Sequence, residues 1–198
     1  MSAHDVEAAC IGRSFGDSLS VHATDPHAHL VALGADAFAH VSGSLARHLA
    51  ETERILRSWN SRRALCLAGL YHAVYGTDGI RGSLAALDRR DAIVAIVGAE
   101  AEALAYLYGA CAREIFHPRI GTSDQLRFAD RFTASEYPIS LASLRDFCEL
   151  TVANELELAI ASDAFRSEYA VELSAFFRRM EGLVSAECER TWRTVLAH

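Results

Sequence analysis

The chain has 198 residues, enough for one domain that buries roughly 70% of the surface exposed by its unfolded form. A hydrophobic content of 51%, abundant Ala, Leu and Glu, and only three prolines predict a helical protein and exclude a disordered one. All 19 basic residues are arginines, which excludes Schiff-base chemistry and a lysine-dependent phosphate loop, and a net charge of −7 without a basic run disfavours nucleic-acid binding.

The cysteines indicate a reducing compartment. They are widely spaced, odd in number and form no CxxC pair, so we interpret them as reduced core residues: Cys10, Cys66, Cys111, Cys148 and Cys188. No signal-peptide pattern opens the sequence, and no apolar run reaches about 18 residues. We therefore expect a cytoplasmic protein without membrane or nucleic-acid partners, which acts on a small molecule that could be anionic; a homodimer stays open.

Capping residues and apolar periodicity predict a series of helices. Asp25 followed by Pro26 is typical of a helix start, since Asp accepts hydrogen bonds from first-turn amides and Pro fits the first helical position. In chain order the predicted helices run from Ser2 to about Ile11, from Asp25 to about Leu33, from the Ser42-Gly43-Ser44 segment to Trp59, from Ser61 to about Tyr75, from Asp88 or Asp91 through Gly98, from Ala99 to about Glu114, from Ser140 to about Ala161, and in one or two segments over 163–198 with a break near Gly182.

Residues 116–140 interrupt this pattern at His117-Pro118 and Gly121, and predict either a long loop or a short hairpin. Because long loops in compact domains are often functional, we interpret this segment as a candidate lid. The predicted fold class is all-α, a single compact helical bundle over 1–198 with its core at about 25–162 and a C-terminal helical cover at 163–198.

Three histidines stand in residues 40–78, a mostly apolar stretch of helical pattern. His48 and Thr52 fall on the apolar face of their predicted helix, three and seven residues after Leu45. His72 lies near the end of the next helix, which is apolar on nearly every side and is therefore expected to be central. Since His48 and His72 are 24 residues apart, antiparallel packing of the two helices would bring their imidazoles together.

The segments RHLAETERILRSWN, with His48, and LCLAGLYHAVYGTDG, with His72, resemble the HD superfamily of metal-dependent phosphohydrolases, which includes the guanosine tetraphosphate hydrolase domain. In that family a His early in one helix is followed, at a similar spacing, by His-Asp at the end of a hydrophobic helix. With the later run IVAIVGAEAEALA, the resemblance covers residues 40–110 well and extends weakly to 160. It implies an HD-like bundle in which His48 and His72 hold a divalent metal, Fe, Mn or Zn.

The sequence departs from that family at its carboxylates. Ala73 stands where the family has the Asp of the His-Asp pair. The family's last ligand is an Asp on a late helix, and two segments could replace it: Ala-Asn-Glu on a predicted helix, with Asn154 or Glu155, or Ala-Asp-Arg, with Asp130. A third imidazole could come from His40, if the Ser-Gly-Ser break that follows folds it back over the helix start; otherwise we expect His40 to contact substrate.

Three functions follow from this pattern. The first is a divergent HD-type enzyme in which a single divalent metal supports hydrolysis or, as in the inositol oxygenase branch of the superfamily, oxygen-dependent chemistry. The second is a metal-free acid-base enzyme, and the third is a non-catalytic module that binds a ligand or protein. In the second, the histidines would work with neighbouring polar groups: Thr52, Tyr75, Asn154 and Glu155. Helical geometry alone leaves open whether Asn154 or Glu155 faces the core.

Overall fold

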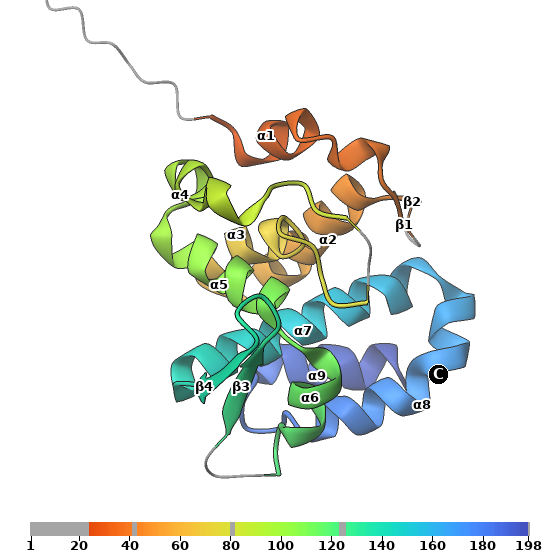
Figure 1. Cartoon of the computed structure of the whole chain (residues 1–198). Helices are drawn as coiled ribbons and strands as arrows, with labels where there is room; N and C mark the ends of the chain where they lie inside the picture. Colours follow the sequence, from red (N-terminus) through yellow and green to blue (C-terminus); the bar gives the residue numbers. More distant parts are fainter. Residues whose placement is uncertain (1–23, 41–42, 80–81, 123–125, 198) are drawn as a thin grey trace, which may run out of the picture.

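The computed structural model describes residues 24–40, 43–79, 82–122 and 126–197. Within them the chain is predominantly helical, with two small antiparallel sheets, β1-β2 and β3-β4, so the predicted all-α class is confirmed (Figure 1). The elements are α1 (Pro26–Ala32), η1 (Ala35–Ala37), β1 (Ala39–His40), β2 (Gly43–Ser44), α2 (Leu45–Ser58), α3 (Arg63–Tyr71), η2 (Leu87–Arg89), α4 (Arg90–Val97), α5 (Ala99–Ala110), α6 (Arg113–Phe116), η3 (His117–Arg119), β3 (Arg127–Asp130), β4 (Ser135–Pro138), α7 (Leu141–Ala161), α8 (Asp163–Arg178) and α9 (Ala186–Val195). The helix predicted from Ser2 lies outside the described residues.

Side-chain caps define several of these helix starts, as predicted. Asp25, Ser44 and Ser140 each accept a hydrogen bond from a first-turn amide of α1, α2 and α7. Three boundaries differ from prediction. Arg62 rather than Ser61 is the N-cap of α3, without a side-chain capping bond, and α3 ends at Tyr71 rather than at about Tyr75. Helix α5 ends at Ala110, so that a separate short helix, α6, follows.

Helices α2 and α3 pack closely because Gly69 has no side chain. A Cβ atom at Gly69 would lie 2.5 Å from Cδ1 of Leu56 and 3.6 Å from Cγ2 of Thr52, both on α2. The connection between the helices turns at Asn60, whose φ of 57° is a left-handed conformation that Asn tolerates. The glycine thus sets the spacing of the helix pair that carries His48 and His72.

Replacing Gly69 by Val is expected to destabilise the protein by about 1–3 kcal/mol, because the added methyl groups would meet Leu56 in a packed interface. Urea unfolding monitored by circular dichroism measures this change. Ala64→Val, a substitution on the partly buried part of the same helix, is the matched control and should cost less. Equal stability of Gly69→Val and the wild type would contradict the close-packing argument.

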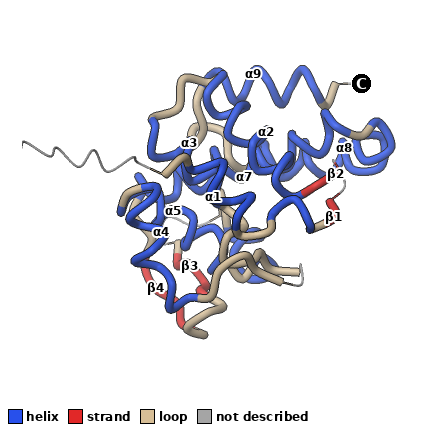
Figure 2. Tube along the Cα trace, turned by 90° about the horizontal axis from the view of Figure 1, so that it is seen from above, coloured by secondary structure: helices blue, strands red, loops and turns tan. Residues whose placement is uncertain are grey.

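Helix α7 runs through the middle of the molecule (Figures 1 and 2). It contacts α2 and α3, and also α8 and α9, so residues on nearly all its sides are buried. Burial on this helix is not confined to apolar residues: Leu158 is only partly buried, whereas the polar Asn154 and Glu157 are buried. Because α7 packs against α2 and α3 as well as α8 and α9, some of its polar residues lie against α2.

The segment predicted as a loop or hairpin contains a hairpin. Strands β3 and β4 pair in antiparallel register, with Arg127 opposite Pro138 and Asp130 opposite Ser135. The ring of Phe128 is fully buried and lies 4.9 Å from that of Phe116 between centroids, which anchors the hairpin to the core.

The C-terminal helices contribute to the core as well as covering it. Phe177 of α8 and Trp192 of α9 are buried, with ring centroids 5.9 Å apart. The described cysteines are buried and free, as predicted; Cys10 lies outside the described residues. Among the described helices, none has the length and apolarity needed to cross a membrane.

Candidate functional site: a histidine cluster in a cavity

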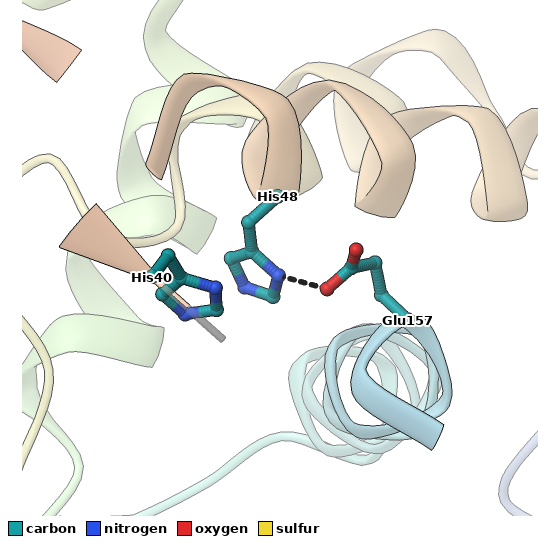
Figure 3. A group of neighbouring side chains, drawn as sticks. All are labelled: His40, His48 and Glu157. Carbon is teal, nitrogen blue, oxygen red and sulfur yellow. Dashed lines mark hydrogen bonds and ion pairs between the residues drawn. The ribbon is translucent and has the colours of Figure 1, made fainter. Parts of the chain in front are cut away.

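Three imidazoles meet where β1, α2 and the end of α3 come together. The ring of His40 stacks on that of His48, with centroids 4.0 Å apart, and His72 meets His48 edge-on at 5.1 Å. His40 reaches this position because β1 and β2 pair, with His40 opposite Gly43, and fold the chain back over the start of α2. Figure 3 shows His40 beside His48, with Glu157 of α7 facing them.

Both ring nitrogens of the buried His48 contact oxygen atoms of α7. Nδ1 lies 2.5 Å from Oε2 of Glu157, and Nε2 lies 2.9 Å from Oδ1 of Asn154. The carboxylate is an acceptor, so Nδ1 carries a proton. The Asn154 amide in turn donates to Oε1 of Glu155 at 3.1 Å, which extends the hydrogen-bonded chain by one more residue.

The orientation of His72 is fixed by the backbone. Its Nδ1 donates to the carbonyl oxygen of Gly69 at 2.7 Å, so the in-plane lone pair of the neutral ring is on Nε2. Burial, followed by the proximity of His48, holds the pKa of His72 well below its ordinary value, so the ring is neutral. Nε2 has no hydrogen-bond partner among the described residues and is the atom available to a ligand.

Residues of this cluster could hold a metal ion. His40, His48 and Glu157 each offer a ligand atom, and these atoms all lie within 4.8 Å of one another. The 2.5 Å contact between His48 and Glu157 is a hydrogen-bond distance, shorter than the roughly 3 Å between neighbouring ligand atoms with metal bonds of about 2.1 Å. In this arrangement Glu157 orients His48 from behind, as carboxylates commonly do for metal-binding histidines.

The cluster opens into a cavity of about 200 Å³. Its wall combines the three histidines with apolar and polar residues of α2, α6, α7 and the segments around them: Phe38, Ala39, His40, Leu45, His48, His72, Ala73, Gly76, Thr77, Gly82, Ser83, Leu84, Arg113, Asn154, Glu155 and Leu158. Burial raises the pKa of Glu155, although Arg113 opposes this shift. Burial and then His48 lower the pKa of His40.

The structure brings together most of the residues that the sequence singled out. His40, His48, His72, Asn154 and Glu155 all line the cavity, so both candidates on α7 face it.

Three predicted site residues do not line this cavity. The Thr52 hydroxyl donates to the backbone carbonyl of His48 within α2, and the Tyr75 hydroxyl donates to Glu102. The Asp130 carboxylate accepts hydrogen bonds from the amides of Phe132 and Thr133, which stabilises the turn between β3 and β4. Each of these oxygen atoms therefore has a structural partner elsewhere. No described residue of the β3-β4 hairpin lines the cavity either, so the predicted lid does not cover it.

Two site residues escaped the sequence analysis. Glu157 lies three residues after Asn154, one helical turn along the same face of α7, and this spacing was the available signal. Arg113 begins α6, far from the histidines in sequence, and no local pattern pointed to its position at the cavity.

Residues 29–113 match a protein family described as a domain of unknown function (DUF6817). This part of the chain is similar to that family and contains the three clustered histidines and Arg113, whereas the contributions of α7 lie beyond it. Neither a curated protein nor a solved structure matches the chain.

Proposed function

We propose that the protein is a small-molecule hydrolase of divergent HD type, with one divalent metal bound at the histidine cluster. Nε2 of His48, Nε2 of His72 and Oδ1 of Asn154 are the proposed ligand atoms, and Glu157 orients His48. The observation that carries the proposal is the way both buried imidazoles are held. In each ring Nδ1 donates to an oxygen, so Nε2 is the nitrogen that could bind a metal.

The separation of one pair of the proposed ligand atoms fits such a site. Nε2 of His48 and Oδ1 of Asn154 are 2.9 Å apart, close to the roughly 3 Å between two ligand atoms bound at about 2.1 Å and at right angles. Without metal, the same pair forms a hydrogen bond. A metal would therefore take the place of a proton between these two atoms, without a change in the helix positions.

The HD resemblance supports the same location. The positions that correspond to the family's ligands, His48, His72, Ala73 and Asn154, all line one cavity although they come from three segments. Asn154 then replaces the late Asp of the family, and nothing at Ala73 replaces the Asp of the His-Asp pair. One metal, rather than the family's usual pair, is what this reduced ligand set can hold.

Hydrolysis is favoured over oxygen-dependent chemistry by the charges of these ligands. Two imidazoles and an amide are neutral, so a bound divalent ion keeps its full charge and lowers the pKa of a water molecule most effectively. Iron oxygenases generally need a carboxylate ligand beside two histidines. Here the carboxylate of Glu157 already accepts the Nδ1 proton of His48.

His40 is assigned to the substrate. Its ring stacks on His48 with an angle of 25° between the planes, so the in-plane lone pairs of the two rings run side by side instead of converging. A partly buried, neutral imidazole at the cavity wall can bind substrate or transfer a proton during hydrolysis.

Metal loading tests the proposal. The full chain is purified without chelator, dialysed against Zn²⁺, Mn²⁺ or Fe²⁺, and analysed by plasma mass spectrometry. We expect about one tightly bound ion per chain. We also expect the protein to hydrolyse at least one compound from a panel of esters, amides and phosphate esters. Chelator should abolish this hydrolysis, and added metal should restore it. A chain that retains no metal after loading sinks the proposal.

A metal-free acid-base enzyme is the second candidate, and one observation favours it. Glu157, His48, Asn154 and Glu155 form a continuous hydrogen-bonded chain without any metal. Such a chain can orient an imidazole for proton transfer. Activity that persists unchanged in excess chelator would select this candidate over the metal-dependent one.

A further inference from the structure

Arg113 holds a fixed position at the wall of the cavity. Its backbone amide donates to Oδ2 of Asp78 at 2.9 Å, which ties the start of α6 to the loop after α3. Its guanidinium donates to the hydroxyl of Tyr108 at 3.2 Å and lies over that ring, 5.5 Å from the centroid. Since both ends of this lining residue are held, its guanidinium has a defined orientation.

The charge of this guanidinium has no ion-pair partner among the described residues. No described carboxylate lies within 4.0 Å of it, whereas Arg62 and Arg90 each bind a carboxylate with two hydrogen bonds. Arg113 is partly buried, and a cation out of full contact with water is costly unless an anion compensates it. The position therefore suits an anion that enters the cavity.

The neighbouring acid does not fill this role. Glu155 also lines the cavity, but its Oε1 accepts from the Asn154 amide at 3.1 Å. No ion pair within 4.0 Å joins the Glu155 carboxylate to Arg113. The Arg113 charge is left without an ion-pair partner among the described residues, at a residue that lines the cavity.

We propose that Arg113 binds the carboxylate group of a small organic acid in this cavity. A guanidinium presents parallel N–H groups that match the two oxygens of a carboxylate. Arg113 is the one arginine among the described lining residues, and the chain has no lysine, so the lining side chains supply one permanent cation, which matches the single charge of a carboxylate. The volume of about 200 Å³ lies below the ~300–1,000 Å³ of typical ligand pockets, which favours a small acid.

This inference deepens the proposed function and rests on it in one respect. With its carboxylate at Arg113, the remainder of the molecule lies toward His48 and His72, which line the same cavity. The acid is thus placed as the substrate, with its reacting bond on the histidine side. Binding of the carboxylate itself does not require a metal.

Calorimetric titration of the full chain tests the inference, in metal-free and Zn²⁺-treated form. The probes are acetate, lactate and pyruvate, each compared with its neutral amide, and inorganic phosphate. We expect at least one carboxylate to bind ten or more times as tightly as its amide and more tightly than phosphate. Arg113→Gln should weaken the binding of that carboxylate by about 10- to 100-fold, since a hydrogen bond to a charged group contributes about 1.5–3 kcal/mol.

Two further variants make the result specific. Arg113→Lys keeps the charge but loses the paired N–H groups, and should fall between the wild type and Arg113→Gln. Arg119→Gln removes an exposed arginine that pairs with Glu136, and should bind as the wild type does. Circular dichroism checks that each variant is folded.

Any one of four results would overturn the inference. The first two are equal affinity for an acid and its amide, and equal affinity of Arg113→Gln and the wild type for the carboxylate. The others are tighter binding of phosphate than of any carboxylate, and no carboxylate binding in either the metal-free or the Zn²⁺-treated protein. The proposed function is judged separately by metal uptake. A chain that binds carboxylates through Arg113 but takes up no metal would lose the metal-dependent function and keep the anion site. Metal uptake without Arg113-dependent binding would remove only the anion site.

Discussion

His72→Ala and His48→Ala are each expected to weaken metal binding by more than about 100-fold. Loss of a residue that only supports a metal ligand typically costs 10- to 100-fold, and removal of the ligand itself should cost more. Competition with a chromophoric chelator measures the affinity of each variant. Affinity within threefold of the wild type in either variant would contradict the assignment of that histidine.

The control for these variants is His27→Ala. The His27 side chain is 48% exposed and pairs with Glu53, and it does not line the cavity. Its removal should leave metal affinity unchanged. Because His48 and His72 are buried, thermal unfolding of both variants must show a cooperative transition before a loss of affinity is assigned to the site.

Glu157 variants are expected to separate orientation from direct ligation. Glu157→Gln keeps an oxygen that can accept the Nδ1 proton of His48, so we expect a loss of metal affinity of about tenfold. Glu157→Ala removes the acceptor, which should lower affinity by up to about 100-fold and destabilise the fold by about 1–3 kcal/mol, because a buried donor is left unpaired. The chelator competition and urea unfolding give the two quantities.

Direct ligation by Glu157 predicts a different order. In that case Glu157→Gln would lose as much affinity as His72→Ala, because an amide is a much weaker ligand than a carboxylate. Glu51→Gln is the matched control: this partly exposed acid on α2 pairs with Arg54, and its replacement should have no effect on metal affinity. Full affinity in Glu157→Ala would remove Glu157 from the site altogether.

Local signals in the sequence predicted much of the fold. Asp25, Ser44 and Ser140 were recognisable as N-caps because capping depends on residues within one turn. The apolar pattern around His72 placed α3 at the centre, and Leu65 to Tyr71 are all buried. The burial of α7 on nearly all sides was less predictable, since it depends on helices that come later in the chain.

The site divides in the same way. The spacing of His48 and His72 on two consecutive helices predicted that the two rings meet. The interruption of the helical pattern after His40 allowed the prediction that His40 folds back over the start of the helix, and its ring does stack on His48. Thr52 shares a helix with His48, yet its hydroxyl is bonded to its own backbone, which periodicity does not reveal. The contact between Glu157 and His48 depends on how α7 is oriented relative to α2, which is a property of the tertiary structure.

The central claim is that one metal ion binds between α2, α3 and α7 at the histidine cluster. Anomalous diffraction from crystals of the full chain grown with Zn²⁺, recorded on both sides of the zinc absorption edge, tests it most directly. We predict a single strong peak within bonding distance of Nε2 of His48 and Nε2 of His72, beside Oδ1 of Asn154. A zinc-loaded crystal with no peak there, or with its strongest peak at another site, would contradict the account.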